Sequence, residues 1–361
     1  MTAATKPVLA VRDLRTYFRT RTGDVKAVDG VSYHVNPGEI VAFVGESGCG
    51  KSVTQYSTLQ LVPPPGEVVG GEVLFEGLNL LDLKPYSPQM RAVRGGGIGV
   101  VFQEPMTSLN PVMTVGKQIA ESIRVHLKLS RADAMSRSID LLTRVGIPDA
   151  AQRARAYPHE FSGGMRQRVM IAMALACDPR LIIADEATTA LDVTTEAQLL
   201  EMIRDVVRET ETALILVTHN LGIVARYADR VYVMYAGDIV ESGTTSEIFE
   251  NPKHPYTLGL LSAMPRIDDP HERQLEPIPG VPPNLLDKPD RCPFMPRCPF
   301  ATATCETSPK PLLEGGEHSA ACYEVDRSQS LLRAQRELRE QRAELAARSV
   351  VNDLTAPGGM P

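Results

Sequence analysis

The stretch Gly45-Glu46-Ser47-Gly48-Cys49-Gly50-Lys51-Ser52 follows an apolar run at residues 40–44 and leads into a segment, residues 53–62, that three prolines end. This order of strand, glycine-rich loop and helix is the context in which the pattern G-x-x-x-x-G-K-S binds phosphate. Glycines let backbone N–H groups point inward at phosphate oxygens, and the start of the following helix favours the same anion. A glycine-rich turn without a ligand is the alternative, and the complete motif in this setting argues against it.

The motif predicts a nucleotide site with a defined set of residues. Lys51 is expected to reach the β- and γ-phosphates, and Ser52 is expected to bind Mg²⁺. The residues expected to surround the phosphates are Gly45, Ser47, Gly48, Cys49 and Gly50. Nucleotide binding is therefore the starting point for interpreting the rest of the chain.

Length and charge limit the class of protein. A chain of 361 residues exceeds one ordinary domain, so we expect a core of more than about 200 residues with an appended segment. The net charge of −6 argues against a nucleic-acid-binding protein, because such proteins gather Lys and Arg on one surface. No apolar run approaches the roughly 20 residues that cross a bilayer, and residues 1–7 lack the apolar core of a signal peptide. We expect a cytosolic chain that acts at membranes only through partner subunits.

Apolar runs alternate with helical patterns up to about residue 250. Apolar residues at helical spacing between residues 115 and 145 predict a helical insertion, which we place at about residues 104–178. Runs typical of buried strands occur at residues 97–102, 181–184, 213–217 and 231–235. This alternation predicts an α/β fold with a largely parallel sheet.

The composition changes near residue 252, because 14 of the 28 prolines lie between Pro252 and Pro311. We therefore divide the chain into a nucleotide-binding domain at residues 1–251 and a small irregular Cys-rich domain at residues 252–325. Residues 326–361 are predicted to form a charged helix and a disordered Gly/Pro tail.

Four of the six cysteines fall within 31 residues: Cys292, Cys298, Cys305 and Cys322. In a reducing compartment such clustering favours a metal over disulfides. The spacing lacks the C-x2-C pairs of structural zinc sites, whereas four thiolates also suit an iron–sulfur cluster. Zinc, an iron–sulfur cluster and free or disulfide-paired thiols all stay open on spacing alone.

Further motifs follow the phosphate-binding loop in an order that resembles the ATP-binding subunits of ABC transporters. The run Phe161-Ser162-Gly163-Gly164-Met165-Arg166-Gln167-Arg168 is similar to the ABC signature, with Met165 where glutamine is common. Ser162 and the N–H groups of Gly163 and Gly164 lie at a predicted helix start, which suits a γ-phosphate. The resemblance implies that this phosphate belongs to ATP on a second ATPase subunit, so that one chain holds two half-sites.

The same resemblance implies roles for individual residues. Asp185 matches the carboxylate that helps to hold Mg²⁺, and Glu186 matches the base that polarises the attacking water. His219 matches the switch histidine at the γ-phosphate, and Gln103 matches the residue that joins the Mg²⁺ site to the membrane subunits. Phe18 matches the aromatic residue that stacks on adenine. Four of these residues have an ordinary structural alternative: Glu186 as a helix-terminal carboxylate, His219 as a loop histidine, Gln103 as a strand end and Phe18 as a core or edge aromatic.

The segment at residues 251–261, with His254-Pro255-Tyr256, resembles the one that follows the ATPase core in oligopeptide, dipeptide and nickel importers. That resemblance implies a peripheral protein at the cytoplasmic face of the inner membrane. Its implied partners are a second ABC ATPase subunit, identical or different, two membrane permease subunits and an extracytoplasmic substrate-binding protein. The binding protein and the membrane subunits choose the cargo, so the sequence leaves peptide and nickel open.

Related peptide-importer ATPases carry a [4Fe-4S] cluster in the cysteine-rich region, which moves our prediction for the four cysteines toward iron, with Zn²⁺ as the alternative. The other class of protein to weigh is a soluble ABC ATPase of translation or DNA repair. One phosphate-binding motif and no long coiled-coil insertion argue against that class.

Overall fold

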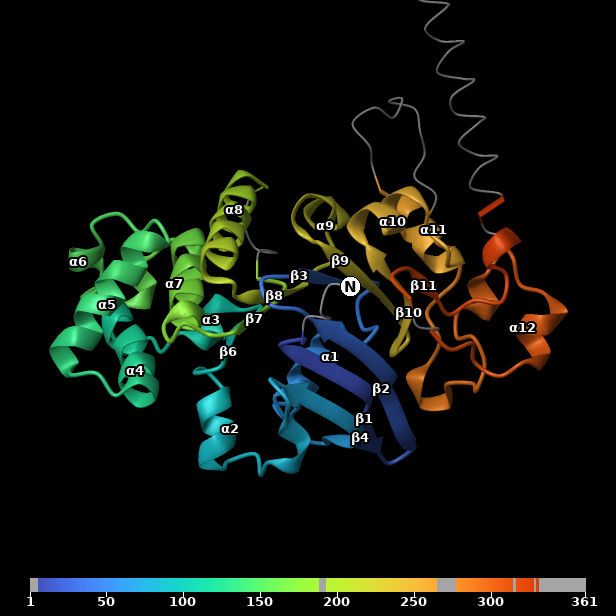
Figure 1. The fold of residues 1–361 in the computed structure, drawn as a ribbon, viewed down its shortest axis with the longest axis horizontal. Coiled ribbons are helices and arrows are strands. Elements are labelled where there is room, and N and C mark those ends of the chain that lie inside the picture. The colour runs from blue at the N-terminus through green and yellow to red at the C-terminus, as the bar shows by residue number, and fades with distance from the viewer. Residues whose placement is uncertain (1–5, 188–192, 265–276, 314–315, 328, 331–361) are drawn as a thin grey trace, which may run out of the picture.

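The computed structural model describes residues 6–187, 193–264, 277–313, 316–327 and 329–330 (Figure 1). Within these residues the chain forms a seven-stranded sheet in the order β11-β10-β9-β3-β8-β7-β6 and a four-stranded sheet in the order β2-β1-β4-β5. Helices surround the larger sheet. The α/β fold class predicted from the alternation of apolar strands and helices is confirmed.

Five consecutive strands of the larger sheet run parallel to one another: β9, β3, β8, β7 and β6. Every residue of β3, β7 and β8 is buried, because each of these strands has a neighbour on both sides and covered faces. β10 and β11 extend the sheet in antiparallel pairing. The strands are β3 (Ile40–Val44), β6 (Ile98–Val101), β7 (Leu181–Asp185), β8 (Ala213–Val217), β9 (Arg230–Tyr235), β10 (Asp238–Thr244) and β11 (Ser319–Ala320).

The smaller sheet is antiparallel and packs against the larger one. Its strands are β1 (Leu9–Thr20), β2 (Gly23–Val35), β4 (Gly66–Phe75) and β5 (Leu78–Asn79). Tyr33 of β2 lies edge-on to Phe43 of β3 with 4.8 Å between ring centroids, and Phe43 stacks on Tyr232 of β9 at 5.2 Å. These rings belong to the apolar layer that joins the two sheets.

A group of helices follows β6 and forms one end of the molecule (Figure 1). In α4 (Val115–Leu127), Val115, Ile119 and Ile123 repeat at helical spacing and are fully buried. They belong to the same apolar core as α7 and one face of the large sheet. The first helices of the chain are α1 (Lys51–Thr58), η1 (Leu80–Asp82), α2 (Pro88–Val93), α3 (Pro105–Ser108), α5 (Arg131–Arg144), α6 (Ala150–Arg153), η2 (Pro158–Glu160) and α7 (Gly163–Leu175).

The remaining helices follow β7, and the residues after β9 form the edge of the large sheet that lies opposite β6. The later helices are α8 (Val193–Thr210), α9 (Leu221–Tyr227), α10 (Thr245–Glu250), α11 (Pro255–Ser262), η3 (Leu285–Asp287), η4 (Met295–Arg297) and α12 (Ala303–Thr307). We call the described residues from 252 onward the C-terminal segment. An aromatic cluster and the short strand β11 fix the shape of this segment.

The aromatic cluster consists of Tyr235 from β9, Tyr256 from α11 and Phe294 from the cysteine-rich stretch. The centroid of the Tyr235 ring lies 4.6 Å from that of Tyr256 and 5.3 Å from that of Phe294. All three side chains are fully buried or nearly so. Large buried aromatic surfaces contribute strongly to packing, and here they join the C-terminal segment to the sheet.

The charged helix predicted from residue 327 onward lies almost entirely outside the described residues. In the part of the chain that the structure describes, no helix is both long and apolar enough to span a membrane.

Glu241 of β10 and His254 organise the start of the C-terminal segment. The Glu241 carboxylate is completely buried and accepts hydrogen bonds from the backbone N–H groups of Lys253 and His254, at 2.7 and 2.8 Å. His254 caps α11, because its Nδ1 accepts from the Tyr256 N–H at 3.1 Å. Burial lowers the pKa of His254 to about 4, although the nearby Glu241 opposes the shift. The folded protein therefore holds a neutral imidazole here.

His254→Asn tests the contribution of this histidine, since asparagine keeps an acceptor at the helix cap. Below about pH 6.5 the unfolded wild-type chain takes up a proton that the buried ring takes up only near pH 4, so the free energy of unfolding falls as the pH falls. Between about pH 7.5 and about pH 5.5 the variant should lose about 1 kcal/mol less stability than the wild type. Urea denaturation at the two pH values measures the difference, and equal losses would contradict the assignment.

Candidate functional site

The parallel strands bring the predicted site residues to one edge of the sheet. The carboxyl ends of β3, β7 and β8 lie side by side, because Phe43 pairs with Val217 and Asp185 pairs with Val217 in the same register. The phosphate-binding loop follows β3, Glu186 follows β7 and His219 follows β8. Gln103 lies just beyond β6. An edge where several loops meet in this way is the usual place for a ligand in a parallel α/β sheet.

Close packing explains two of the glycines in the phosphate-binding loop. A Cβ on Gly45 would lie 2.2 Å from the Met234 carbonyl oxygen, and one on Gly50 would lie 2.3 Å from the Ala27 carbonyl oxygen. Both residues also have positive φ, at +149° and +106°. Only glycine fits at these two positions, so the loop keeps its curved shape at the start of α1.

Lys51 occupies the inside of the loop. Its Nζ donates to the carbonyl oxygens of Gly45 and Glu46, at 2.9 and 3.0 Å, and the residue is only 5% exposed. The neighbouring Cys49 is also buried, and burial raises the pKa of its thiol. The ammonium group is thus the positive charge held at the centre of this loop, where a phosphate would need it.

Asp185 forms the junction between the loop and β7. One carboxylate oxygen accepts from Ser52 Oγ at 2.7 Å, and the other accepts from the Tyr56 hydroxyl at 2.6 Å. Burial raises the pKa of Asp185, and both hydrogen bonds oppose that shift. A hydroxyl and a carboxylate in contact are hard oxygen donors of the kind Mg²⁺ prefers. The pair Ser52 and Asp185 therefore fits a magnesium ion.

The sequence did not predict Tyr56 as a residue of this site. It lies four residues after Ser52 and so on the same face of α1, which is the only sequence signal that could have pointed to it. Its own pKa is raised, first by burial and then by its bond to Asp185. The structure adds Tyr56 to the predicted site as the second donor to the buried carboxylate.

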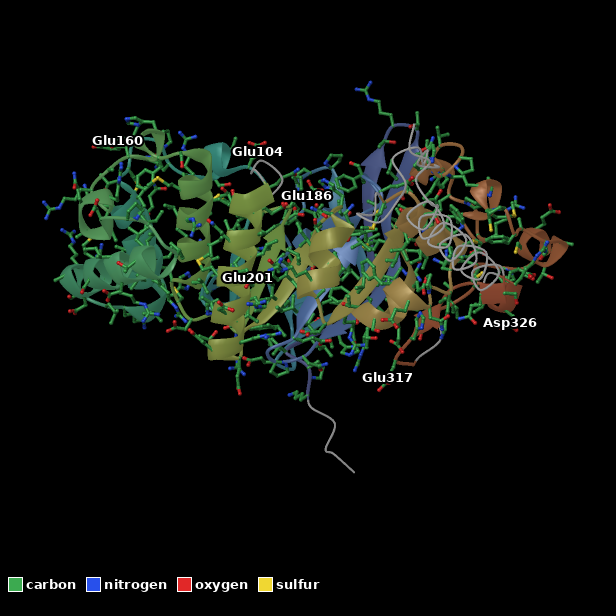
Figure 2. The ribbon with its side chains drawn as sticks, turned by 90° about the horizontal axis from the view of Figure 1, so that it is seen from above. Glu104, Glu160, Glu186, Glu201, Glu317 and Asp326 are labelled. Carbon is green, nitrogen blue, oxygen red and sulfur yellow. The ribbon has the colours of Figure 1, made fainter. Side chains whose placement is uncertain are left out.

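Glu186 lies beside two of the other predicted residues. Its Oε2 accepts from the Gln103 amide at 2.6 Å, and its Oε1 lies 3.5 Å from His219 Nδ1. Its backbone has a positive φ of 45°, which is strained for a residue with a side chain, and its N–H bonds to the Val217 carbonyl at 2.9 Å. Figure 2 shows Glu186 toward the middle of the molecule, with Glu160 nearer the end formed by the helices. Gln103 is thus paired with Glu186 and not with Ser52 or Asp185.

The signature residues lie apart from this cluster. Ser162 caps α7, with its Oγ accepting from the Met165 N–H at 3.3 Å. Ser162 and Gly163 are exposed, and a Cβ on Gly163 would meet no atom within 4 Å. Among the described residues, no hydrogen bond joins these two residues to the phosphate-binding loop. This helix start is open to an outside partner.

Phe18 lies on β1 opposite Gly66 of β4. Its ring packs closely on that glycine, since a Cβ on Gly66 would come within 2.7 Å of Phe18 Cε1. Phe18 is half-buried, and its stacking on adenine stays a prediction. The segment Ala190-Leu191-Asp192, which resembles the loop that touches the partner ATPase, lies outside the described residues.

The prediction of an iron–sulfur cluster is wrong. Cys292, Cys298, Cys305 and Cys322 line one small cavity, but its volume of about 20 Å³ is room for little more than one water. The described residues contain no group of three or more His, Cys, Asp or Glu side chains placed to hold a metal ion. The zinc alternative fails on the same finding.

Two of these thiols have pKa values well above that of a free cysteine. Burial raises the pKa of Cys292 to about 11 and that of Cys322 to about 12. Burial disfavours the charged thiolate, so both groups are neutral thiols near neutral pH. The cysteines cluster because Phe294 and its neighbours draw this stretch into the apolar core.

Comparison with known proteins agrees with this architecture. The model of the ABC transporter family matches residues 28–189, and that of the oligopeptide/dipeptide transporter C-terminal region matches residues 240–305. A putative peptide import ATP-binding protein of Brucella ovis is 52% identical over 87% of this chain and 95% of its own length. The oligopeptide transport ATP-binding protein OppD of Bacillus subtilis is 52% identical over 81% of this chain and 82% of its own length.

Among solved structures, the dimeric structure of MJ0796, a bacterial ABC transporter cassette, matches with a TM-score of 0.59 and 25% identity. The match covers 66% of this chain and 98% of that one. The fold and the site define an ATP-hydrolysing P-loop cassette. The chain belongs to the ABC transporter family, and the resemblance predicted from its motifs is confirmed.

Tyr56→Phe tests the junction at Asp185. Without the hydroxyl, the buried carboxylate loses one of two hydrogen bonds that favour its charged form, so protons compete better with Mg²⁺. We expect the Mg²⁺ concentration for half-maximal ATPase activity to rise about tenfold, with kcat at saturating Mg²⁺ little changed. The defect should deepen as the pH falls.

Tyr323→Phe is the matched control, because its hydroxyl donates to the Pro309 carbonyl within the C-terminal segment and not to Asp185. If both variants show the same Mg²⁺ dependence as the wild type, Tyr56 has no part in holding Asp185 ready for the ion.

Proposed function

We propose that this chain powers the import of peptides across the cytoplasmic membrane by hydrolysing ATP. The peptide cargo is inferred from the match of residues 240–305 to the oligopeptide/dipeptide transporter C-terminal region. Relatives that are 52% identical and are named for peptide import or oligopeptide transport support the same cargo. The nickel cargo that the sequence left open has no comparable support in these relatives.

The residues at the sheet edge divide the chemistry between them. The loop N–H groups and Lys51 bind the β- and γ-phosphates, while Ser52 and Asp185 hold Mg²⁺. When bound, this ion neutralises charge that develops on the phosphate oxygens. Phosphoryl transfer to water needs such neutralisation and a positioned nucleophile rather than a covalent intermediate.

Glu186 supplies the second requirement. Its carboxylate orients and polarises a water molecule for attack on the γ-phosphorus, and the bond from that phosphorus to the bridging oxygen of ADP then breaks. Gln103 and His219 hold the carboxylate from two sides, at 2.6 and 3.5 Å. His219 is 58% exposed, so it is accessible to a γ-phosphate.

The complete site requires a second subunit. Ser162 and Gly163 lie exposed at the start of α7, and a helix start of this kind attracts phosphate. We infer that they bind ATP held by a partner ATPase, identical or different, as a half-site. Hydrolysis then waits for the two subunits to close, and closure is the motion that membrane subunits can use.

The remaining partners follow from the same function. Two permease subunits would carry the peptide, and an extracytoplasmic binding protein would deliver it. The chain would lie peripherally at the cytoplasmic face of the membrane, with the loop after Gln103 as the contact with the permeases. In this proposal residues 1–251 form the ATPase domain, and residues 252–325 form the C-terminal domain appended to it.

Uptake into proteoliposomes that contain the complete transporter tests the proposal. Labelled peptide should accumulate with MgATP and the wild-type chain. Glu186→Gln should bind ATP but lose more than about a hundredfold in turnover and uptake, because it removes the group that orients water. Glu209→Gln is the matched control, since Glu209 pairs with Arg144 on the helical surface.

Accumulation of nickel without peptide would overturn the proposed cargo and leave the ATPase assignment in place. Equal turnover by the Glu186→Gln variant and the wild type would overturn the role of Glu186.

A further inference from the structure

One ion pair joins the C-terminal segment to the phosphate-binding loop. Arg297, the last residue of η4, donates from both terminal nitrogens to the Glu46 carboxylate, at 2.8 and 3.0 Å. The two residues are 251 positions apart in the sequence. Glu46 immediately follows Gly45, so this contact reaches the loop at its second residue.

The rest of the Arg297 side chain is held just as firmly. Its Nε donates to the Pro279 carbonyl at 2.8 Å, and one terminal nitrogen donates to the Ile278 carbonyl at 3.2 Å. The guanidinium also lies over the Tyr235 ring, 5.8 Å from its centroid. The side chain is only 4% exposed. A planar, fully paired guanidinium is suited to fix a carboxylate in one orientation.

The backbone of Glu46 is held from the same side. Its N–H donates to the Tyr256 hydroxyl at 2.8 Å, and Tyr256 is itself completely buried in the aromatic cluster. The Glu46 carbonyl accepts from Lys51 Nζ at 3.0 Å. Glu46 thus contacts both the C-terminal segment and Lys51 of the phosphate-binding loop.

We propose that Arg297 and Tyr256 are positioning residues that set the shape of the phosphate-binding loop, so that the C-terminal segment controls the affinity of this ATPase for nucleotide. Neither residue touches the phosphates. Arg297 fixes the side chain of Glu46, Tyr256 fixes its N–H, and its carbonyl then holds the ammonium group of Lys51. A change in the packing of the C-terminal segment would reach Lys51 through this residue.

The competing explanation is that the ion pair only attaches the C-terminal segment to the core. Both explanations predict a loss of thermal stability when Arg297 is changed, because its guanidinium is buried and fully hydrogen-bonded and these contacts are lost. Only positioning predicts that changes at Glu46, Arg297 and Tyr256 weaken nucleotide binding in protein that is still folded.

Three variants of the full-length chain separate these explanations: Glu46→Gln, Arg297→Met and Tyr256→Phe. Glu46→Gln leaves the bonds of Arg297 to Pro279 and Ile278 in place, and Tyr256→Phe keeps its ring in the cluster. We expect the Kd for a fluorescent ATP analogue with Mg²⁺ to rise about tenfold in the first two variants, within the usual range for coupled sites. Tyr256→Phe should show a smaller rise with little change in Tm.

The double variant Glu46→Gln, Arg297→Met should bind no more weakly than the weaker single variant, because both changes break the same contact. Arg291→Met is the control, since Arg291 lies exposed in the same segment and donates to the Glu306 carbonyl rather than to the phosphate-binding loop. The Kd is measured at a temperature well below the Tm of every variant, so that all of the protein is folded. An unchanged Kd in the Glu46→Gln and Tyr256→Phe variants, or additive effects in the double variant, would overturn the proposal. Because the readout is nucleotide binding, it is independent of the cargo.

Discussion

The hydrogen bond between Ser52 and the buried carboxylate of Asp185, at 2.7 Å, is the contact on which the site depends. It joins the first turn of α1 to the end of β7 and so fixes the phosphate-binding loop, which follows β3, relative to a strand two places away in the sheet. A buried carboxylate is costly unless its oxygens are satisfied, and Ser52 and Tyr56 satisfy one oxygen each. The parallel pairing of β3, β8 and β7 then determines where Glu186 and His219 lie. Charge, metal ligands and the water-orienting group are therefore assembled by the sheet itself.

The C-terminal segment depends on the ATPase core for its shape. It has few strands and helices of its own, and it packs Tyr256 and Phe294 onto Tyr235 of β9. Glu241 adds a polar connection, because this buried carboxylate also lies 2.8 Å from Nε2 of His318. Arg297 connects the segment to the phosphate-binding loop through its ion pair with Glu46. Core and segment thus share one continuous set of contacts that ends at Glu46.

Local signals made much of this predictable. The glycine pattern and the apolar strands are local signals that pointed to Lys51, and the resemblance of the later motifs to ABC ATPases assigned Asp185 and Glu186 to the same site. Tyr56 and Arg297 could not be predicted, because their partners lie 129 and 251 positions away. The cysteines misled for a related reason: spacing suggested a metal, whereas the three-dimensional packing leaves a cavity too small for a cluster.

The central claim is that this loop, with Lys51 at its centre, binds the phosphates of the ATP that the protein hydrolyses. Equilibrium binding of MgATP to the full-length chain tests it most directly, by comparing the wild type with Lys51→Ala. The account predicts one nucleotide per wild-type chain and an affinity at least about tenfold weaker in the variant, since a charge-assisted contact to phosphate is lost. An unchanged affinity in a folded Lys51→Ala variant would contradict it.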